Sequence, residues 1–330
     1  MLSFPQEPSL ARSLPELPDL QDMPGGTVYE PKFDGYRALV FVQGGACRIQ
    51  SRAGRDVTHA FPEIAAAAVE TLASGVVLDG EIVLWGDEVD DFTELDRRLN
   101  QPPDAVPRHR HPASYIAFDL LAGAGMDMRA SAFRIRRHAL EMMLGDDAPP
   151  LHLVPQTPDV EEARSWLVTY GETHVGIEGV VAKGLATAYE PGGSPWVKVR
   201  TQDSDECVIG AVLGSLRAPR RLVLGMLDED GLLGPIGITA ELTLPDSRRV
   251  AKLLEPSDGT HPWDVSRVLR ETPGWTGPDD AVVTLVRPTH VIEVSAHAED
   301  DPSGWVTPRD FVRSRPDLRP DDLQARWLHA

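Results

Sequence analysis

The chain has 330 residues, of which 42% are hydrophobic and 25% charged, a composition that is typical of a globular protein and excludes a long disordered chain. Its net charge of −19 disfavours attraction of nucleic acid over the whole surface, although a local basic groove is compatible with an acidic body. No apolar run reaches membrane-spanning length, and the first residues lack the apolar core of a signal peptide, so we expect a cytoplasmic protein without a membrane partner.

Hydrophobic periodicity and turn residues divide the first part of the chain into short elements. After a proline-rich extended segment, they predict a hairpin around Gly44-Gly45, a helix at 62–73, a strand at 75–85, a loop at 96–112, a strand at 114–122, helices at 131–144 and 159–170, and strands at 177–184 and 194–200. Ser131 is the expected cap of the second helix, and Gly145 is its expected end.

A polar segment at residues 201–206 separates this part from a region with a different residue pattern. Beyond the break, short β runs alternate with glycine and proline, and one helical stretch lies at 247–255. We expect five short strands and one helix, a pattern that favours a small barrel, of which the oligonucleotide-binding (OB) type is the commonest. The predicted domains are therefore residues 1–202 and residues 203–330.

Lysine is rare in this chain. Of the 32 basic residues, 28 are arginines and the other four are Lys32, Lys183, Lys198 and Lys252. Arginine keeps its proton in proteins, whereas lysine loses it where its surroundings lower the pKa, and the free amine is a nucleophile. Lys32 follows a proline and precedes Gly35, a frame that can hold a side chain against a ligand. An ordinary turn is the alternative for this lysine.

Two apolar strands are interrupted by carboxylates, at Asp79-Gly80-Glu81 and at Glu178-Gly179. Buried carboxylates are costly unless they are paired or bound to metal, so these positions indicate either a metal site or structural salt bridges. Strand alternation places Lys198 and Arg200 on one face, where they invite an anion or form an amphipathic edge strand. No glycine-rich phosphate loop occurs, so phosphate would be bound by side chains and a hard metal ion.

The order of these motifs resembles that of a known family. The series EPKFDGYR, SRAGRDVT, VLDGEIV, AFDLL, IEGVVAK and WVKVR is similar to the nucleotidyltransferase motifs of ATP-dependent DNA ligases, in particular the small bacterial ligases of the LigC and LigD type. The resemblance covers about residues 20–320. It implies an α+β fold, with a nucleotidyltransferase (adenylation) domain of antiparallel sheets and helices followed by a C-terminal OB-fold β-barrel.

The resemblance also implies a role for each matching residue. Lys32 would be the catalytic nucleophile that attacks the α-phosphorus of ATP, and Phe118 would stack on adenine. The other residues implied to bind the nucleotide are Glu30, Arg37, Arg52, Glu81, Lys198, Arg200, Arg313 and Arg315. Those implied to bind the metal ion, Mg²⁺ or Mn²⁺, are Glu178, Asp34 and Glu81.

The implied activity is that of an ATP-dependent DNA ligase, which seals nicks between a 5′-phosphate and a 3′-hydroxyl through a lysyl-AMP intermediate. Nicked or broken duplex DNA would be the substrate. The chain is acidic and has no room for a large separate DNA-binding domain. We therefore expect weak nick binding or a helper protein in DNA repair, and an architecture that works as a monomer.

The C-terminal motif departs from the family pattern. Arg313, Arg315 and Asp317 match its later part, but Val306-Thr307 stand where Arg-His is usual, and this bears on the efficiency of self-adenylation. Two alternatives stay open: an RNA ligase or capping-type nucleotidyltransferase of the same fold, and a degenerate ligase that acts as a DNA-end-binding module. The intact Lys32 favours an enzyme.

Overall fold

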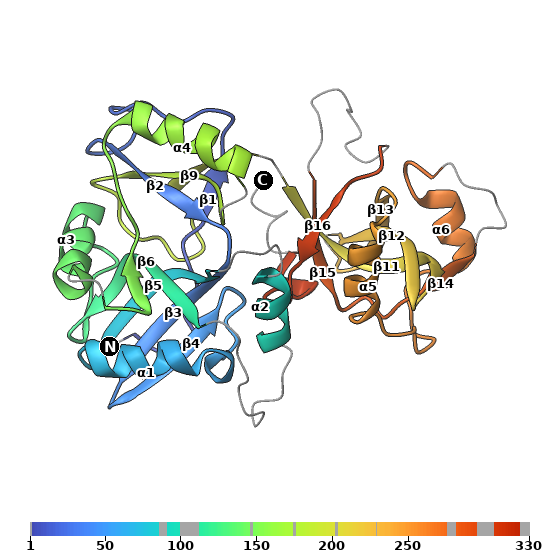
Figure 1. The fold of residues 1–330 in the computed structure, drawn as a ribbon, viewed down its shortest axis with the longest axis horizontal. Coiled ribbons are helices and arrows are strands. Elements are labelled where there is room, and N and C mark those ends of the chain that lie inside the picture. The colour runs from blue at the N-terminus through green and yellow to red at the C-terminus, as the bar shows by residue number, and fades with distance from the viewer. Residues whose placement is uncertain are drawn as a thin grey trace. The chain divides into compact units, whose positions relative to one another are not determined.

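Two compact units, Met1–Gln202 and Asp203–Ala330, make up the chain (Figure 1). The computed structural model describes residues 2–85, 91–99, 112–145, 148–173, 176–201, 204–228, 230–275, 282–295 and 307–323. Each unit is built mainly from antiparallel strands with helices packed against them, which is the mixed α and β architecture expected. The assignment of the units as a nucleotidyltransferase domain and an OB domain stays a prediction.

The smaller sheet of the first unit carries three of the predicted motifs. Its strand order is β1 (Ala11–Ser13), β10 (Trp196–Arg200), β9 (Ile177–Gly184) and β2 (Thr27–Phe33). Strand β9 runs antiparallel to both β2 and β10, so that Gly179 lies opposite Lys32 on one side and opposite Arg200 on the other. Helix α4 (Val160–Thr173) packs against β9 and β2 (Figure 1). Segments far apart in sequence therefore meet around Gly179.

The larger sheet of the first unit holds the remaining motifs. Its path runs through β4 (Ala46–Ser51), β3 (Tyr36–Gln43), β5 (Val76–Leu84), β6 (Ala113–Gly123) and β7 (Met126–Asp127), and β8 (Leu151–Leu153) also pairs with β6. The glycines between β3 and β4 have φ values of 60° and 79°, the left-handed backbone that a two-residue hairpin turn requires. The predicted hairpin is thus confirmed.

Helices cover this larger sheet and close its core. The single-turn helix η1 (Thr58–Ala60) leads into α1 (Pro62–Thr71), and α3 (Phe133–Leu144) packs against β6. Ile64 and Leu140 from these helices join Leu78 and Leu120 from the strands in one fully buried apolar cluster. The period of apolar residues that predicted both helices therefore reflects the faces they bury.

Two predictions in the first unit need correction. Residues 96–99, expected in a loop, belong to helix α2 (Asp91–Leu99), while residues 100–111 lie outside the described residues. Ser131 does not cap α3, whose N-cap residue is Ala132. The first amides of that helix instead donate to backbone carbonyls from the end of β9 onward, Phe133 to Thr187 at 2.8 Å and Arg134 to Leu185 at 3.0 Å, so no side-chain cap is required.

The second unit contains one sheet and, among its described residues, two helices. Its path is β13 (Leu233–Ile238), β12 (Ala218–Leu227), β11 (Ser204–Ser215), β15 (Val291–Ser295) and β16 (Phe311–Ser314), and β14 (Val283–Leu285) also pairs with β11. Helix α5 (Leu244–Ala251) overlaps the predicted one, but the described residues form six strands and two helices, one strand and one helix more than expected. Sequence reasoning did not identify α6 (Val265–Glu271), β14 or β16 individually. These three elements have seven residues or fewer, too short for a clear periodic pattern.

The ends of the strand path in the second unit are joined. Arg309, just before β16, donates its amide to the carbonyl of Ile238 at 3.0 Å and accepts the amide of Ala240 at 2.7 Å. These bonds link the outer strand β13 to the segment that leads into the other outer strand. A sheet linked in this way leaves less open edge for pairing with other chains.

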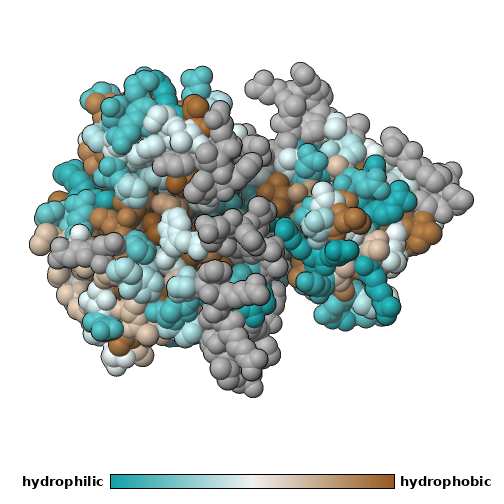
Figure 2. Space-filling model, in the orientation of Figure 1, coloured by the Kyte–Doolittle hydropathy of each residue, from teal (hydrophilic) through white to brown (hydrophobic). Residues whose placement is uncertain are grey.

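On the part of the face that Figure 2 colours by hydropathy, hydrophilic residues are interspersed with apolar patches. Individual exposed apolar side chains, such as Met142 and Leu244, are normal for a globular protein. Among the described residues, no helix combines the length and apolar character needed to cross a membrane.

Candidate active site

Lys32 lies at the centre of a cluster of charged side chains in the first unit. Its Nζ forms an ion pair with Oε1 of Glu178, and Nη2 of Arg200 lies 3.8 Å from the same oxygen. The three side chains keep between 11% and 21% of their surface exposed, so a ligand can reach them. The β2–β9–β10 register explains the arrangement, because Gly179 lies between the strands that carry Lys32 and Arg200.

The surroundings of Lys32 hold its pKa well below the ordinary lysine value. Burial is the largest cause, and the positive charge of Arg200 is the next, with a smaller contribution in the same direction from Lys198. Glu81 and Asp34 act in the opposite direction. The structure thus brings together around Lys32 the predicted residues Glu178, Arg200, Lys198, Glu81 and Asp34.

An aromatic and cationic group adjoins this cluster. The guanidinium of Arg37 lies 5.3 Å from the ring centre of Phe118 and 5.4 Å from that of Trp196, and the two rings meet edge to face. Arg37 lies opposite Glu81 in the pairing of β3 with β5, so these two predicted nucleotide-binding residues are neighbours. Phe118 is only partly buried, and this leaves part of its ring surface for a ligand.

Glu30 is almost fully buried and is linked to Phe118 through Lys183. Its Oε2 forms an ion pair with Nζ of Lys183 at 2.7 Å, and its Oε1 accepts a hydrogen bond from Nε2 of Gln156 at 3.1 Å. Burial raises the pKa of the Glu30 carboxyl, while the charges of Lys183 and Arg137 act in the opposite direction. Lys183 in turn donates to the backbone carbonyl of Phe118 at 2.9 Å, so one ammonium joins both residues.

Sequence reasoning missed the residues that hold Arg37. Asp79 binds its guanidinium through two hydrogen bonds of 3.0 and 2.6 Å, and the hydroxyl of Tyr189 donates to the same carboxylate at 2.7 Å. Asp79 is fully buried. The carboxylate within an apolar strand was the available signal, and the structural salt bridge was the correct interpretation for Asp79. No sequence feature indicated Tyr189.

Other predicted residues lie outside these contacts. Arg52 is half-buried in the turn that follows β4. Arg313 and Arg315 belong to the second unit, where they are buried and form ion pairs with Glu293. Arg315 also binds Asp317 at 2.8 Å and Oε1 of Glu206 at 2.5 Å. Within that unit these arginines are structural, and their contact with a nucleotide stays a prediction.

The altered C-terminal positions are partly described: Thr307 is exposed, and Val306 lies outside the described residues. The predicted metal ligands also stay a prediction. In the described ranges, no group of three or more His, Cys, Asp or Glu side chains is arranged to hold a metal ion.

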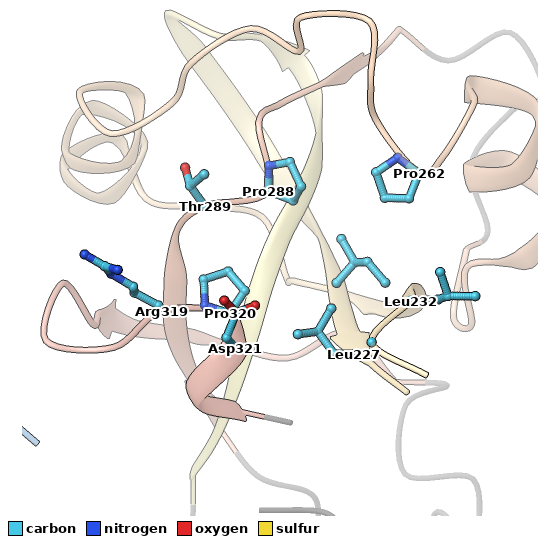
Figure 3. A pocket seen from close by; sticks show the side chains of 10 residues that line it. Leu227, Leu232, Pro262, Pro288, Thr289, Arg319, Pro320 and Asp321 are labelled. Atoms are coloured by element: carbon cyan, nitrogen blue, oxygen red, sulfur yellow. The ribbon is translucent and has the colours of Figure 1, made fainter. Parts of the chain in front are cut away.

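A hollow of about 480 Å³ lies in the second unit and contains none of the predicted site residues. Figure 3 shows leucine and proline side chains around it, with Arg319 and Asp321 near one side. Its lining offers no lysine nucleophile and no aromatic ring. It therefore carries no argument for nucleotide chemistry.

Gly35 is required by close packing next to Lys32. A Cβ atom at this position would lie 2.2 Å from the carbonyl oxygen of Ile82 and 3.0 Å from a methyl group of Val83. We therefore expect Gly35→Ala to lower the free energy of unfolding by about 1–3 kcal/mol and to displace Lys32. Urea denaturation would measure this loss, with Gly45→Ala as a control, because a Cβ there meets no atom although the turn is strained. Equal losses in both variants would contradict the packing argument.

The comparisons with known proteins agree on one family. The model of the ATP dependent DNA ligase domain matches residues 8–200. DNA ligase C2 of Mycolicibacterium smegmatis is 32% identical over 308 residues, which cover 88% of this chain and 85% of the relative. DNA ligase C of Mycobacterium tuberculosis is 31% identical over 336 residues, which cover 96% and 91%. A solved structure, a mycobacterial DNA ligase D complexed with ATP and MES, is 28% identical with a TM-score of 0.57, over 95% of this chain and 97% of that one.

The mixed α and β fold, the lysine-centred charge cluster and these matches define the class of protein as an enzyme, a ligase. More specifically, the chain belongs to the ATP-dependent DNA ligase family. This family membership decides between the alternatives that the motifs left open, in favour of DNA ligation.

Proposed function

We propose that this DNA ligase works through an AMP group carried on Lys32. Its amine attacks the α-phosphorus of ATP, a P–N bond forms, and pyrophosphate leaves. An oxygen of a DNA 5′-phosphate then attacks the same phosphorus and releases the amine. Finally, the 3′-hydroxyl oxygen attacks the 5′-phosphate, the phosphodiester forms, and AMP leaves. Nicked duplex DNA is the proposed substrate.

The observation that carries this proposal is the environment of Lys32. A lysine with the ordinary pKa of about 10.4 is almost fully protonated near neutral pH and is a poor nucleophile. Burial and the charge of Arg200 lower the pKa of Lys32 and so favour the free amine. Glu178, as its ion-pair partner, is placed to orient the side chain before the reaction.

The neighbouring residues support a nucleotide laid across the site. Lys198 and Arg200 would bind the α-phosphate, Arg37 and Glu81 the ribose, and Phe118 the adenine ring. Glu30 would border the adenine end. Arg52, Arg313 and Arg315 are proposed to contact phosphate; for the last two this would require exchange of their present carboxylate partners.

The donor set near Lys32 fits a hard divalent cation. Mg²⁺ takes oxygen ligands and is usually held by one or two carboxylates together with substrate phosphates, so a preformed cage of three residues is not needed. Three carboxylates interact electrostatically with Lys32 and would hold Mg²⁺ or Mn²⁺: Glu178, Asp34 and Glu81. When bound, the cation would offset phosphate charge and favour departure of pyrophosphate.

The second unit is proposed to be an OB domain that contacts DNA. The strand pairing that joins β13 to the segment before β16 supports a small barrel. Since the chain has a net charge of −19, we propose weak intrinsic binding to nicks, assisted by a protein partner in DNA repair, with the ligase itself acting as a monomer.

Labelled ATP tests the proposal directly. The purified chain is incubated with ATP labelled at the α-phosphate and with Mg²⁺, and is then chased with a nicked duplex. We expect an acid-labile label on the protein that passes to the DNA and disappears as the nick is sealed. Lys32→Ala serves as the control and should take no label. An unlabelled wild-type protein, or a label retained by Lys32→Ala, would contradict the assignment.

The pH dependence of adenylation follows from the lowered pKa of Lys32. The reaction needs the free amine, so its rate at saturating ATP should rise with pH and level off well below the ordinary lysine pKa of about 10.4. Arg200→Gln removes a charge that lowers this pKa, so the rise should move to higher pH. Single-turnover labelling over a pH series measures both curves. A rise centred on the ordinary lysine value in the wild type would contradict the argument.

A further inference from the structure

Trp85 carries an exposed aromatic ring that the proposed reaction does not use. Half of its surface, 50%, is exposed. Among the side chains that the structure describes, every other Phe, Tyr and Trp is buried or half-buried. The indole ring meets the Phe33 ring edge to face, with 6.0 Å between the ring centres, and Phe33 follows Lys32 directly in β2. The exposed ring therefore lies beside the segment that carries the nucleophile.

Strand alternation places Trp85 on the face of β5 that looks toward the site. A Cβ on Gly35 would lie 3.0 Å from a methyl group of Val83 and 3.1 Å from Cγ of Glu81, so both side chains face the segment that follows β2. Ile82, between them, belongs to the apolar core on the opposite face. Trp85 comes directly after β5 and continues the series of Glu81 and Val83 at the same spacing of two. The ring contact described above agrees with this direction.

A buried apolar cluster links the exposed ring to the proposed adenine site. Val83, Ile116 and Val154 form this cluster, and the half-buried rings of Phe33 and Phe118 both pack against it. Phe33 in turn supports the exposed indole. The indole ring is thus braced from below and lies next to the site where the nucleotide would be held.

A single exposed apolar side chain needs no explanation by itself, and the chain has others, such as Met142 on α3. Trp85 differs from these by its flat ring and by its contact with the neighbour of Lys32. A DNA ligase has to bring a DNA end to the AMP on its nucleophile, so DNA must approach this segment. With a net charge of −19 the chain attracts phosphate weakly, whereas an aromatic ring binds a base without any positive charge.

We propose that Trp85 is a DNA-contact residue, whose indole ring stacks on a nucleotide of the nicked duplex next to the reacting phosphate. This inference rests on the proposed function. Stacking on an aromatic ring tolerates every sequence, because every base has a π-face, and a ligase that seals nicks of any sequence needs contacts of this kind. Phe33 holds the ring beside Lys32, so binding of DNA and presentation of AMP occur at the same place.

Separating AMP transfer to DNA from self-adenylation tests this contact. The full chain is loaded with label from α-labelled ATP, and single-turnover transfer to a nicked duplex is followed over a series of DNA concentrations. For Trp85→Ala we expect the half-saturating DNA concentration to rise by about five-fold or more, the loss that one stacking contact produces. The rate of self-adenylation should change by less than about three-fold. The salt dependence of DNA binding should keep its slope, because no contact with phosphate is removed.

Three further variants serve as controls. Trp85→Phe keeps an aromatic ring and should recover most of the affinity for DNA. Trp85→Leu keeps an apolar side chain without a flat ring and should stay impaired, so full recovery in this variant would contradict stacking. Met142→Ala removes an exposed apolar side chain from α3 and should change neither DNA affinity nor self-adenylation.

Tryptophan fluorescence gives a second measurement that does not depend on catalysis. Stacking on a base quenches indole emission, so a nicked duplex should quench the wild-type protein more strongly than Trp85→Phe, which lacks this indole. The comparison also holds if Trp85→Ala fails to fold, because phenylalanine can keep the contact with Phe33.

The outcomes separate this inference from the function on which it rests. Equal quenching in both proteins, or an unchanged half-saturating DNA concentration in a folded Trp85→Ala, would show that Trp85 does not contact DNA. A loss of self-adenylation as large as the loss of DNA affinity would make Trp85 a support of the Lys32 segment, and the inference would be wrong. A wild-type protein that takes no label from ATP, yet shows the quenching that depends on Trp85, would contradict the proposed function and support the contact.

Discussion

Lys32→Arg is expected to abolish self-adenylation although it keeps the positive charge next to Glu178. Arginine does not lose its proton in proteins, so it supplies no nucleophile. Loss of a nucleophile that acts together with its neighbours typically lowers the rate by about 10⁴-fold or more. The measurement is the rate of label transfer from α-labelled ATP to the protein. Lys198→Arg is the matched control: arginine keeps the positive charge and also donates hydrogen bonds to phosphate, so the rate should fall by about ten-fold at most.

The same variant should retain one part of the activity. In the proposed sequence the last step joins a 3′-hydroxyl to a DNA end that already carries AMP, and the amine of Lys32 takes no part in it. Lys32→Arg should therefore still seal a nick that has been adenylated chemically beforehand. Loss of both activities, in a variant with an unchanged free energy of unfolding, would mean that Lys32 has a role other than that of nucleophile.

The order of the motifs along the chain was sufficient to identify the residues of the charge cluster. Within each strand, alternation of side chains fixes which residues share a face. Strand parity predicted that Lys198 and Arg200 share one face of β10, and the family resemblance associated both with Lys32, beside which the structure brings them. The close approach of strands at the glycine after Glu178 is a finding of the structure. A Cβ on Gly179 would lie 2.2 Å from the carbonyl oxygen of Val199, so no other residue fits there without movement. Of these features, only strand alternation is local and can be seen in a sequence.

Contacts made across long sequence separations were not predictable in the same way. Tyr189 donates to Asp79, a residue 110 positions away in the sequence. Lys183 binds both Phe118 and Glu30 from strand β9, on which sequence reasoning assigned a role only to Glu178. Helix α3 begins without a side-chain cap because the backbone at Leu185 and Thr187 accepts its first amides. Each depends on which strands become neighbours, and the apolar pattern of a single strand carries no such information.

A second large effect concerns the pair formed by Asp119 and Arg136, which supports the strand that carries Phe118. Both side chains are fully buried, and two parallel hydrogen bonds of 2.8 and 3.0 Å join them. Arg136 also donates to the carbonyl of Thr187 at 3.0 Å. We expect Asp119→Asn to lower the free energy of unfolding by about 3–5 kcal/mol, because it leaves a buried guanidinium without its counter-ion. Urea denaturation followed by tryptophan fluorescence would measure the loss.

The size of this loss depends on leaving one charge behind, and this can be tested with two further variants. Replacing both partners, Asp119→Leu with Arg136→Met, removes the stranded charge and should recover most of the stability, since apolar side chains can fill the space. Arg164→Gln, which breaks the half-exposed pair with Glu161 on α4 of the same unit, should cost less than about 1 kcal/mol because water screens that pair. A double variant less stable than Asp119→Asn would show that the geometry of the ion pair, and not the stranded charge, is what stabilises this region. Recovery of stability without recovery of ATP binding would instead show that the pair also sets the position of Phe118, the residue next to Asp119.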